Sequence, residues 1–209
     1  MKAPVSVAVL VSGGGTNLQA LLDAQEAGYF DGEIVLVFSN VKNAFALERA
    51  RTKGIPALYL SRKNFDSDEA FDRELVSILD ENRIDLVVLA GYLRILTSEL
   101  LRKYRFRVIN IHPALLPAFG GKGFYGLRVH QAVRASGERQ TGATVHFVDE
   151  GIDSGLILLQ QAIAIDPTWT AEEIQSEVLK IEHKLLPKAV RAICADKVEI
   201  IDNKVRLWE

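Results

Sequence analysis

Cysteine is nearly absent from this sequence of 209 residues, and neither sign of charge dominates it. The single cysteine, Cys194, excludes a disulfide within the chain and a zinc site built on cysteines, and it is typical of a reducing compartment. With 25 Lys and Arg against 27 Asp and Glu, the formal net charge is -2, which argues against charge-driven binding of nucleic acid or a membrane surface. No apolar run could span a bilayer, and the first residues do not form a signal peptide, so we expect a cytoplasmic protein.

The composition is that of a folded protein, because 48% of the residues are hydrophobic and 25% are charged. We expect one domain over residues 1–209, with a nucleotide- or phosphate-binding half (1–112) and a second half (113–209). Its first half alternates apolar runs with stretches whose apolar residues recur at helical spacing, which predicts a doubly wound, mostly parallel, Rossmann-like α/β sheet. The predicted strands are 5–11, 34–38, 57–60, 86–90 and 108–111, and the predicted helices surround 18–22, 46–50 and 71–79.

Turn-forming and capping residues set the boundaries of these elements. We expect Asp66 and Glu69 to form a capping box at the third helix, and Gly54 with Pro56 to end the second. The second half has a different pattern. It begins with a loop rich in Gly and Pro (113–126) and a short predicted helix (127–135). An antiparallel strand pair (143–148 with 156–165), a long C-terminal helix (170–195) and a terminal hairpin (198–201 with 205–208) are predicted to follow.

A glycine-rich turn, SGGGTN at residues 12–17, joins the first strand to the first helix. Backbone N–H groups at such a helix start collect an anion. Leu18 stands where a dinucleotide fingerprint has its third glycine, Ser39 and Asn40 end the second strand without an acidic residue, and no P-loop lysine is present. The pattern therefore favours a phosphate monoester over NAD or ATP, with a tight turn that binds nothing as the alternative.

Asn110 and His112 lie at the end of the fifth predicted strand and, two residues apart, share one face. An amide beside an imidazole can stabilise an oxyanion and move a proton, which suits acyl transfer to an external nucleophile. Asp153 could orient that imidazole, although alone it is typical of a turn. We see no enzyme nucleophile, and we predict no metal site because His112, His146 and Asp153 match no familiar ligand spacing. We predict a core position for His146 and no catalytic role for it, His130 or His183.

Six segments together resemble the folate-dependent phosphoribosylglycinamide formyltransferase family of purine biosynthesis. They occur in the family's order and reach over nearly the whole chain. They are SGGGTNLQA (12–20), FSN (38–40), LAGYLRIL (89–96), NIHPALLP (110–117), GATVHFV (142–148) and DSG (153–155).

The resemblance implies that 10-formyltetrahydrofolate, as co-substrate, donates its formyl group to the amine of glycinamide ribonucleotide, with no covalent enzyme intermediate and no metal. Together with the charge balance, we expect no nucleic-acid or membrane partner, and we predict a monomer or weak homodimer. The implied catalytic residues are Asn110, His112 and Asp153. The implied ribonucleotide-binding residues are Gly15, Thr16, Asn17 and Glu182, and the implied folate-binding residues are Leu93, Arg94, Ile95, Leu96, Asn110, Val148, Asp149 and Asp153.

Some features depart from the family or discriminate among its branches. Asp68 stands where many relatives carry a basic residue, and the loop after Pro117 is longer than in some of them. The family also implies a cis bond between Leu116 and Pro117. Two related enzymes are alternatives. A formyltetrahydrofolate hydrolase adds an N-terminal regulatory domain, and the methionyl-tRNA formyltransferase adds a basic C-terminal domain. We expect neither extra domain here. A non-enzymatic folate- or phosphate-binding module is the third alternative.

Overall fold

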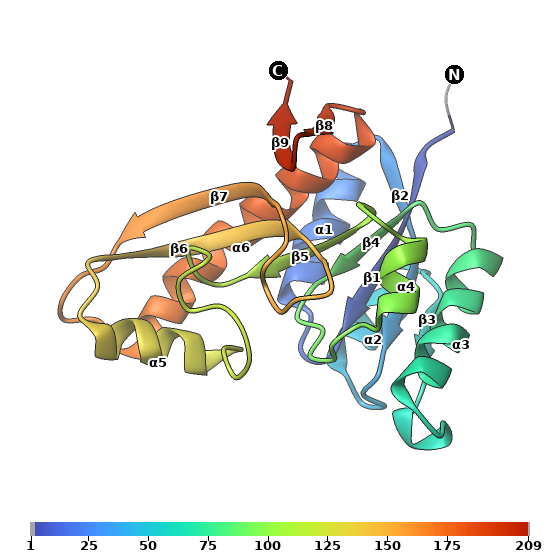
Figure 1. Cartoon of the computed structure of the whole chain (residues 1–209), viewed down its shortest axis with the longest axis horizontal. Coiled ribbons are helices and arrows are strands. Elements are labelled where there is room, and N and C mark those ends of the chain that lie inside the picture. Colours follow the sequence, from blue (N-terminus) through green and yellow to red (C-terminus); the bar gives the residue numbers. More distant parts are fainter. Residues whose placement is uncertain (1–2, 209) are drawn as a thin grey trace. The chain divides into compact units, whose positions relative to one another are not determined.

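The computed structural model describes residues 3–208 and forms two compact units, one up to Ile109 and one from Asn110 on (Figure 1). The strand order is β3-β2-β1-β4-β5-β6-β7, with a separate two-stranded sheet β8-β9. The chain passes from the first unit to the second within one strand, β5 (Val108–His112).

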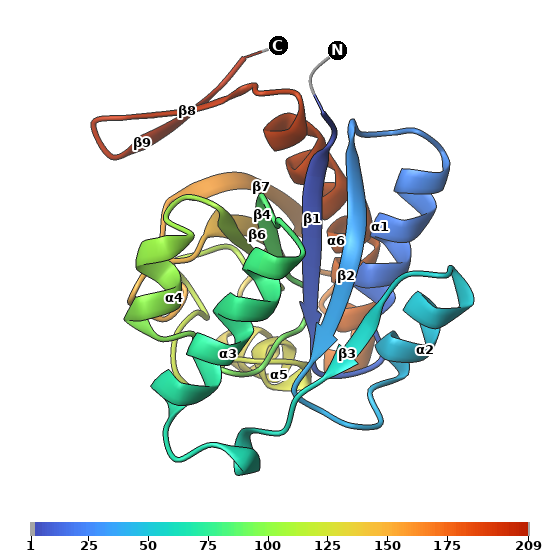
Figure 2. The ribbon, with the colours of Figure 1, turned by 90° about the vertical axis from the view of Figure 1, so that its right-hand side faces the viewer.

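In the N-terminal unit, four parallel strands are covered on both faces. Figure 2 shows α1 and α2 on one side of these strands and α3 and α4 on the other. This double cover explains the apolar runs, and the side chains from Val7 to Val11 are fully buried. The elements are β1 (Val5–Val11), α1 (Thr16–Glu26), β2 (Gly32–Ser39), α2 (Phe45–Thr52), β3 (Ala57–Tyr59), the 3-10 helix η1 (Arg62–Asn64), α3 (Asp68–Glu81), β4 (Leu86–Leu89) and α4 (Ser98–Lys103).

In the C-terminal unit, an antiparallel strand pair packs against the long helix α6. That helix begins with a capping box, in which the side chains of Thr170 and Glu173 satisfy each other's backbone N–H groups. Its buried face includes Ile174, Val178 and Leu185, at helical spacing. The elements after β5 are α5 (Leu127–Ser136), β6 (Gln140–Phe147), β7 (Ile157–Ala164), α6 (Ala171–Cys194), β8 (Val198–Ile201) and β9 (Lys204–Leu207).

The predicted fold class is confirmed, with a mostly parallel sheet, the antiparallel pair β6–β7 and the long C-terminal helix. The implied cis bond between Leu116 and Pro117 is present. The capping prediction for the third helix was wrong, because the Ser67 side chain, one residue after Asp66, accepts the N–H of Ala70. Two short elements, α4 and η1, were not predicted. Within residues 3–208, no helix has the length and apolarity needed to cross a membrane.

Candidate active site

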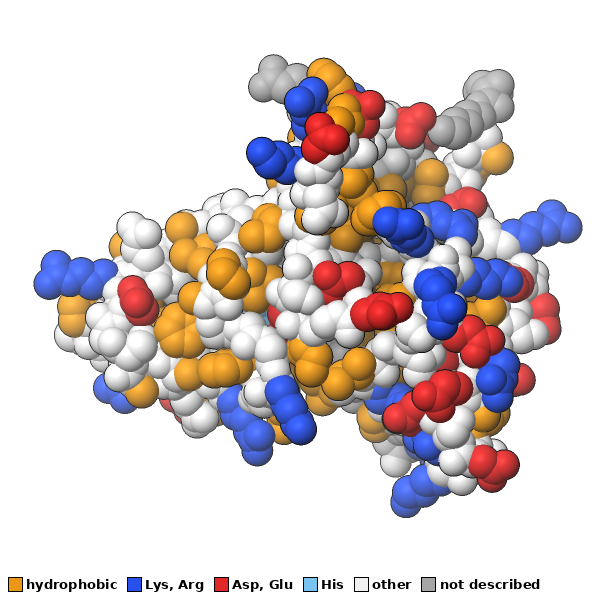
Figure 3. All heavy atoms as spheres, viewed as in Figure 1, with side chains coloured by type: hydrophobic (Ala, Val, Ile, Leu, Met, Phe, Trp, Pro, Cys, Tyr) orange, Lys and Arg blue, Asp and Glu red, His pale blue; other side chains and the backbone are white. Residues whose placement is uncertain are grey.

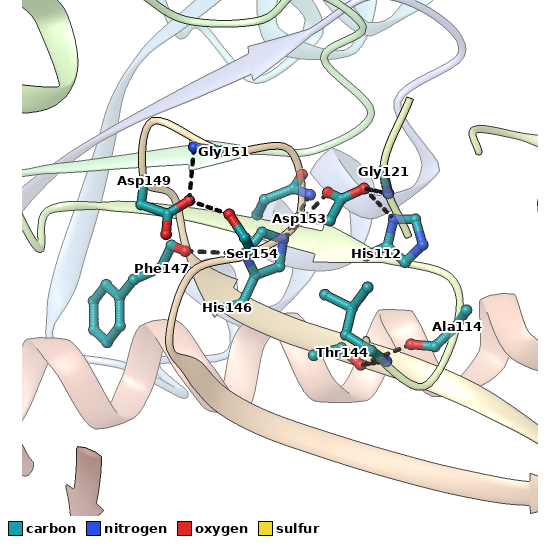
Figure 4. Close-up of polar contacts among 12 residues, drawn as sticks. His112, Ala114, Gly121, Thr144, His146, Phe147, Asp149, Gly151, Asp153 and Ser154 are labelled. Carbon is teal, nitrogen blue, oxygen red and sulfur yellow. Dashed lines mark hydrogen bonds and ion pairs between the residues drawn. The ribbon is translucent and has the colours of Figure 1, made fainter. Parts of the chain in front are cut away.

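Strand β5, strand β6 and the segment after β6 bring four polar side chains together in the C-terminal unit. Figure 4 shows Asp153 between His112 and His146. One carboxylate oxygen of Asp153, Oδ2, lies 3.5 Å from His112 Nδ1, and the other, Oδ1, lies 3.6 Å from His146 Nε2. The amide Nδ2 of Asn110 lies 3.1 Å from the same His146 nitrogen. The structure thus places Asn110, His112 and Asp153 in one cluster, to which it adds His146.

Tight turns between β6 and β7 direct the Asp153 carboxylate inward. The Asp149 carboxylate accepts hydrogen bonds from the Gly151 N–H at 3.1 Å and the Ser154 hydroxyl at 2.8 Å (Figure 4). Asp153 itself takes a left-handed backbone conformation, with φ of 56°. A side chain at Gly155 would place its Cβ 1.8 Å from the Phe147 carbonyl oxygen, so the segment can close only with glycine there.

The loop between β5 and α5 supplies the other side of the cluster. The Thr144 hydroxyl donates to the Ala114 carbonyl at 2.7 Å and accepts the Leu116 N–H at 3.1 Å, which fixes the start of the loop (Figure 4). Further along, the Gly121 N–H donates to Asp153 Oδ2 at 3.0 Å. This loop therefore helps to hold the carboxylate in place.

The hydrogen-bond partners define where the protons lie on both histidines. His112 Nε2 faces the Phe119 carbonyl oxygen at 2.8 Å, and His146 Nδ1 faces the Phe147 carbonyl oxygen at 2.9 Å. A carbonyl oxygen only accepts, so these two nitrogens carry the hydrogens of the neutral rings. In the neutral rings, the nitrogens that face Asp153, His112 Nδ1 and His146 Nε2, are then acceptors. His146 Nε2 accepts from the Asn110 amide.

Burial and charge shift the titration of this cluster. Burial lowers the pKa of His112, and the Asp153 carboxylate and the Phe119 carbonyl only partly oppose that shift. Burial alone would raise the pKa of Asp153, but the contact with His146, the hydrogen bond from the Gly121 N–H and the nearby His112 outweigh it and hold this pKa below its usual value. At neutral pH the cluster therefore contains a neutral His112 imidazole beside the ionised Asp153 carboxylate, and this pair can accept a proton.

Sequence reasoning missed His146. The predicted core position of His146 is confirmed in that 1% of the residue is exposed. Both of its ring nitrogens nevertheless face polar partners, which the prediction did not include. His130, on α5, is also buried, and burial lowers its pKa to about 4. In the described part of the chain, no group of three or more His, Cys, Asp or Glu residues is arranged to hold a metal ion.

The glycine turn of the N-terminal unit is held by its carbonyl groups. Gly13 O accepts the N–H of Ala46 at 3.1 Å, and Gly14 O accepts from Arg49 Nε at 2.8 Å. Gly15 caps α1 with φ of 72°, and a Cβ there would lie 2.5 Å from the Ala46 Cβ, so the fold itself requires this glycine. Gly13 and Gly14 differ, because a Cβ built on either would have no atom of the described residues within 4 Å apart from those of its chain neighbours.

Packing against the rest of the protein therefore explains the glycine at position 15 but not those at 13 and 14. The fold leaves open space beside Gly13 and Gly14, where a bound group could approach the backbone closely. The first N–H groups of α1 lack acceptors within the helix, and the helix dipole favours an anion there. Of the other predicted residues, Thr16 is exposed on the first turn of α1, and the neighbouring Asn17 is buried.

The predicted folate-binding segment lies between β4 and α4. The side chains of Leu93 and Ile95 are 61% and 62% exposed, whereas Leu96 is buried. Arg94 is engaged within the protein, because its guanidinium lies 2.8 Å from Asp68 Oδ1 and 4.6 Å from the centre of the Phe71 ring. Backbone groups and exposed apolar side chains are thus what this segment offers to a ligand.

Asp68 is neutralised by arginines. It forms ion pairs with Arg62 and Arg94, and hydrogen bonds from these two, Arg62 first, lower its pKa. Figure 3 shows acidic and basic side chains interspersed over α3 and α4 on the face in view. An acidic residue at position 68 therefore does not create a field of one sign.

Three further predicted residues belong to the C-terminal unit. Val148 is half-buried and Asp149 is exposed, both in the segment that carries Asp153. The Asp149 carboxylate is used within its own turn, as described above. Glu182 is buried on α6, with 7% of the residue exposed.

The fold and site define an α/β protein with a glycine-rich turn at a helix start and a polar cluster of Asn110, His112, His146 and Asp153. The sequence profile of the formyl transferase family matches residues 5–190. The chain belongs to this family, as the sequence predicts.

The relatives and solved structures fit this membership. The chain is 44% identical over 202 residues to phosphoribosylglycinamide formyltransferase, chloroplastic, of Arabidopsis thaliana, covering 96% of the chain and 69% of that protein. It is 36% identical over 197 residues to phosphoribosylglycinamide formyltransferase of Haemophilus influenzae, covering 94% of the chain and 91% of that protein. Several animal relatives are longer trifunctional purine biosynthetic proteins, of which the chain spans 13 to 20%.

Among solved structures, glycinamide ribonucleotide transformylase 1 of Symbiobacterium toebii superposes with a TM-score of 0.94 at 37% identity, covering 100% of this chain and 96% of that one. A formyltetrahydrofolate deformylase of Pseudomonas syringae also has this fold, with a TM-score of 0.89 at 28% identity. The match covers 99% of this chain but 66% of the deformylase.

Proposed function

We propose that this protein is a phosphoribosylglycinamide formyltransferase, which moves a formyl group from 10-formyltetrahydrofolate to the amine of glycinamide ribonucleotide in purine biosynthesis. The observation that carries the proposal is the cluster around Asp153, which can accept a proton but contains no Ser, Cys or Lys nucleophile. The names of the relatives, at 36% and 44% identity, support the same reaction.

The amine nitrogen attacks the formyl carbon, and the electron pair of the C=O bond moves to its oxygen. An amide nitrogen carries two hydrogens, and Asn110 uses one on His146, so it can donate the other to the developing oxyanion. The attacking nitrogen becomes positive and loses a proton to the unprotonated His112 and Asp153, directly or through water. His112, once protonated at Nδ1, also stabilises the negative oxygen.

Collapse of the tetrahedral intermediate breaks the bond between the formyl carbon and the folate nitrogen. The proton held by His112 and Asp153 passes to that leaving nitrogen, so that proton uptake and release balance. A carboxylate 3.5 Å from the imidazole stabilises the imidazolium while it exists. No step needs a metal or a covalent bond to the protein.

The two substrates bind through different parts of the chain. Gly15, Thr16 and Asn17 bind the phosphate of glycinamide ribonucleotide, with Glu182 as a further contact. Residues 93–96, with Asn110, Val148, Asp149 and Asp153, bind the folate. The open space at Gly13 and Gly14 and the exposed Leu93 and Ile95 support these assignments. The predicted cytoplasmic location and monomer or weak homodimer stay predictions, and the Arabidopsis relative is named as chloroplastic.

A deformylase is the second candidate, favoured by the structural match to the Pseudomonas syringae protein. The test incubates the protein with 10-formyltetrahydrofolate and follows tetrahydrofolate with and without glycinamide ribonucleotide. We expect release only with the amine, together with formylated ribonucleotide. Equal release of formate without the amine would assign the deformylase, and no release in either mixture would leave a non-enzymatic binding module.

A further inference from the structure

Ser12, the residue between β1 and the three glycines, joins three loops of the N-terminal unit. Its hydroxyl donates to Asn40 Oδ1 at 2.6 Å and accepts the N–H of Leu93 at 2.9 Å. Its own N–H donates to the Gly91 carbonyl at 3.0 Å. With 8% of the residue exposed, these bonds are shielded from competing water.

The sheet topology makes this position special. Strand β1 pairs in parallel with β2 on one side and with β4 on the other, so their carboxyl ends lie next to one another. A side chain at the end of β1 can therefore reach the segments that follow both neighbours. The partner on one side is an acceptor, Asn40 Oδ1, and the partner on the other is a donor, the Leu93 N–H, and a hydroxyl serves both.

The two segments next to Ser12 are those assigned to the two substrates. Ser12 directly precedes the glycine turn, and Leu93 begins the segment 93–96. Later residues have other contacts: Arg94 forms an ion pair with Asp68, and the N–H of Thr97, the residue after the segment, donates to Asp72 Oδ2 at 2.6 Å. At the beginning, the side chain of Leu93 is exposed, and its backbone is held by Ser12.

We propose that Ser12 is a positioning residue for both substrates, which sets the phosphate-binding turn and the folate-binding segment relative to each other. This inference rests on the proposed function, because it assigns the two segments to the two substrates. Removing the hydroxyl leaves the Leu93 N–H without its acceptor and releases Asn40, so both segments lose a constraint.

The test compares Ser12→Ala with Ser39→Ala. Ser39 is also buried and ends β2, but its hydroxyl bonds only to the backbone of Val41, two residues away. We expect Ser12→Ala to raise KM about 10-fold for each substrate, with kcat within about 3-fold of the wild type, since its contacts do not include the groups proposed to do the chemistry. Ser39→Ala should leave both KM values within about 2-fold even if it lowers Tm.

A second variant, Asn40→Ala, removes one of the two hydroxyl partners and should raise the KM values by about 3-fold, less than Ser12→Ala. If Ser12→Ala raises only one KM, lowers only kcat, or behaves like Ser39→Ala, Ser12 does not position both segments.

Equilibrium binding separates this inference from the proposed reaction. Calorimetry measures the Kd of glycinamide ribonucleotide and of tetrahydrofolate for the wild type and the same variants. If the wild type binds both but transfers no formyl group, the proposed reaction fails, and weaker binding of both by Ser12→Ala still supports the inference. If the wild type binds neither ligand, both proposals are overturned.

Discussion

Residues 12–17 of the N-terminal unit expose backbone at Gly13 and Gly14, whereas the cluster around Asp153 in the C-terminal unit consists of side chains that are buried (His112 and His146) or half-buried (Asn110 and Asp153). The glycine turn is held by hydrogen bonds to its carbonyl groups, which leaves N–H groups for an anion, and none of its residues titrates. In the other region, the rings of His112 and His146 each lie between a backbone carbonyl oxygen and the Asp153 carboxylate. The two regions therefore differ in kind, because the glycine turn offers backbone groups for binding and the cluster offers side chains for proton transfer.

The largest expected effect comes from the proton-transfer cluster. His112→Ala and Asp153→Asn should each lower kcat by about 10² to 10³, because each removes a group that stabilises charge in the transition state. Steady-state kinetics and thermal melting check this. Glu150→Gln, an exposed acidic neighbour in the same segment as Asp153, is the control and should keep wild-type kcat. Wild-type kcat in a folded His112→Ala would remove that residue from the mechanism.

A change in the glycine turn should break binding and spare the chemistry. In Gly14→Ala the added methyl meets no atom of the described residues within 4 Å beyond its chain neighbours, so we expect unchanged Tm, a KM for glycinamide ribonucleotide raised about 10-fold, and kcat within about 3-fold. Gly15→Ala is the contrasting variant, because its φ of 72° and the nearby Ala46 should cost about 1 to 3 kcal/mol of stability. An unchanged KM in Gly14→Ala would argue against an anion at this turn.

The residue that sequence reasoning missed should have a smaller effect. His146→Ala leaves the Asn110 amide without its acceptor and removes the ring that lies 3.6 Å from Asp153 Oδ1, but it leaves His112 in place. We expect kcat to fall by about 10-fold, less than for His112→Ala, with both KM values little changed. A loss as large as that of His112→Ala would make His146 a direct proton acceptor, and no loss would make it a core residue only.

The pH dependence should show the smallest change. Burial lowers the pKa of His112, so the fall of kcat toward acid should lie below pH 6.5, where protonation removes the neutral imidazole. The Asp153 carboxylate raises this pKa, so in Asp153→Asn the acid limb of the remaining activity should move to lower pH. A shift toward higher pH would contradict this electrostatic coupling.

Much of the fold could be predicted because covered parallel strands produce long apolar runs, and β1 has the predicted limits Val5–Val11. Helix α4 has only six residues, too few for a helical period to stand out. The cap of α3 was misplaced by one residue because Asp66 and Ser67 can both cap, and backbone conformation decides between them.

The candidate site was predicted in part for a related reason. Asn110 and His112 stand two apart on one strand, a local pattern that the sequence displays. The contact between Asn110 and His146 joins residues 36 positions apart, and it depends on how β5, β6 and the 147–155 segment fold together. In a strand whose residues are nearly all buried, a histidine with polar partners has the same pattern as one in an apolar core.

Direct transfer by the buried cluster is tested most sharply in a single turnover with 10-formyltetrahydrofolate labelled in the formyl carbon, quenched at successive times. Direct transfer predicts that label leaves the folate and appears in the ribonucleotide at one rate, with none covalently attached to the protein at any time. Label covalently attached to the protein during the turnover, or label released as formate while the amine is present, would contradict direct transfer.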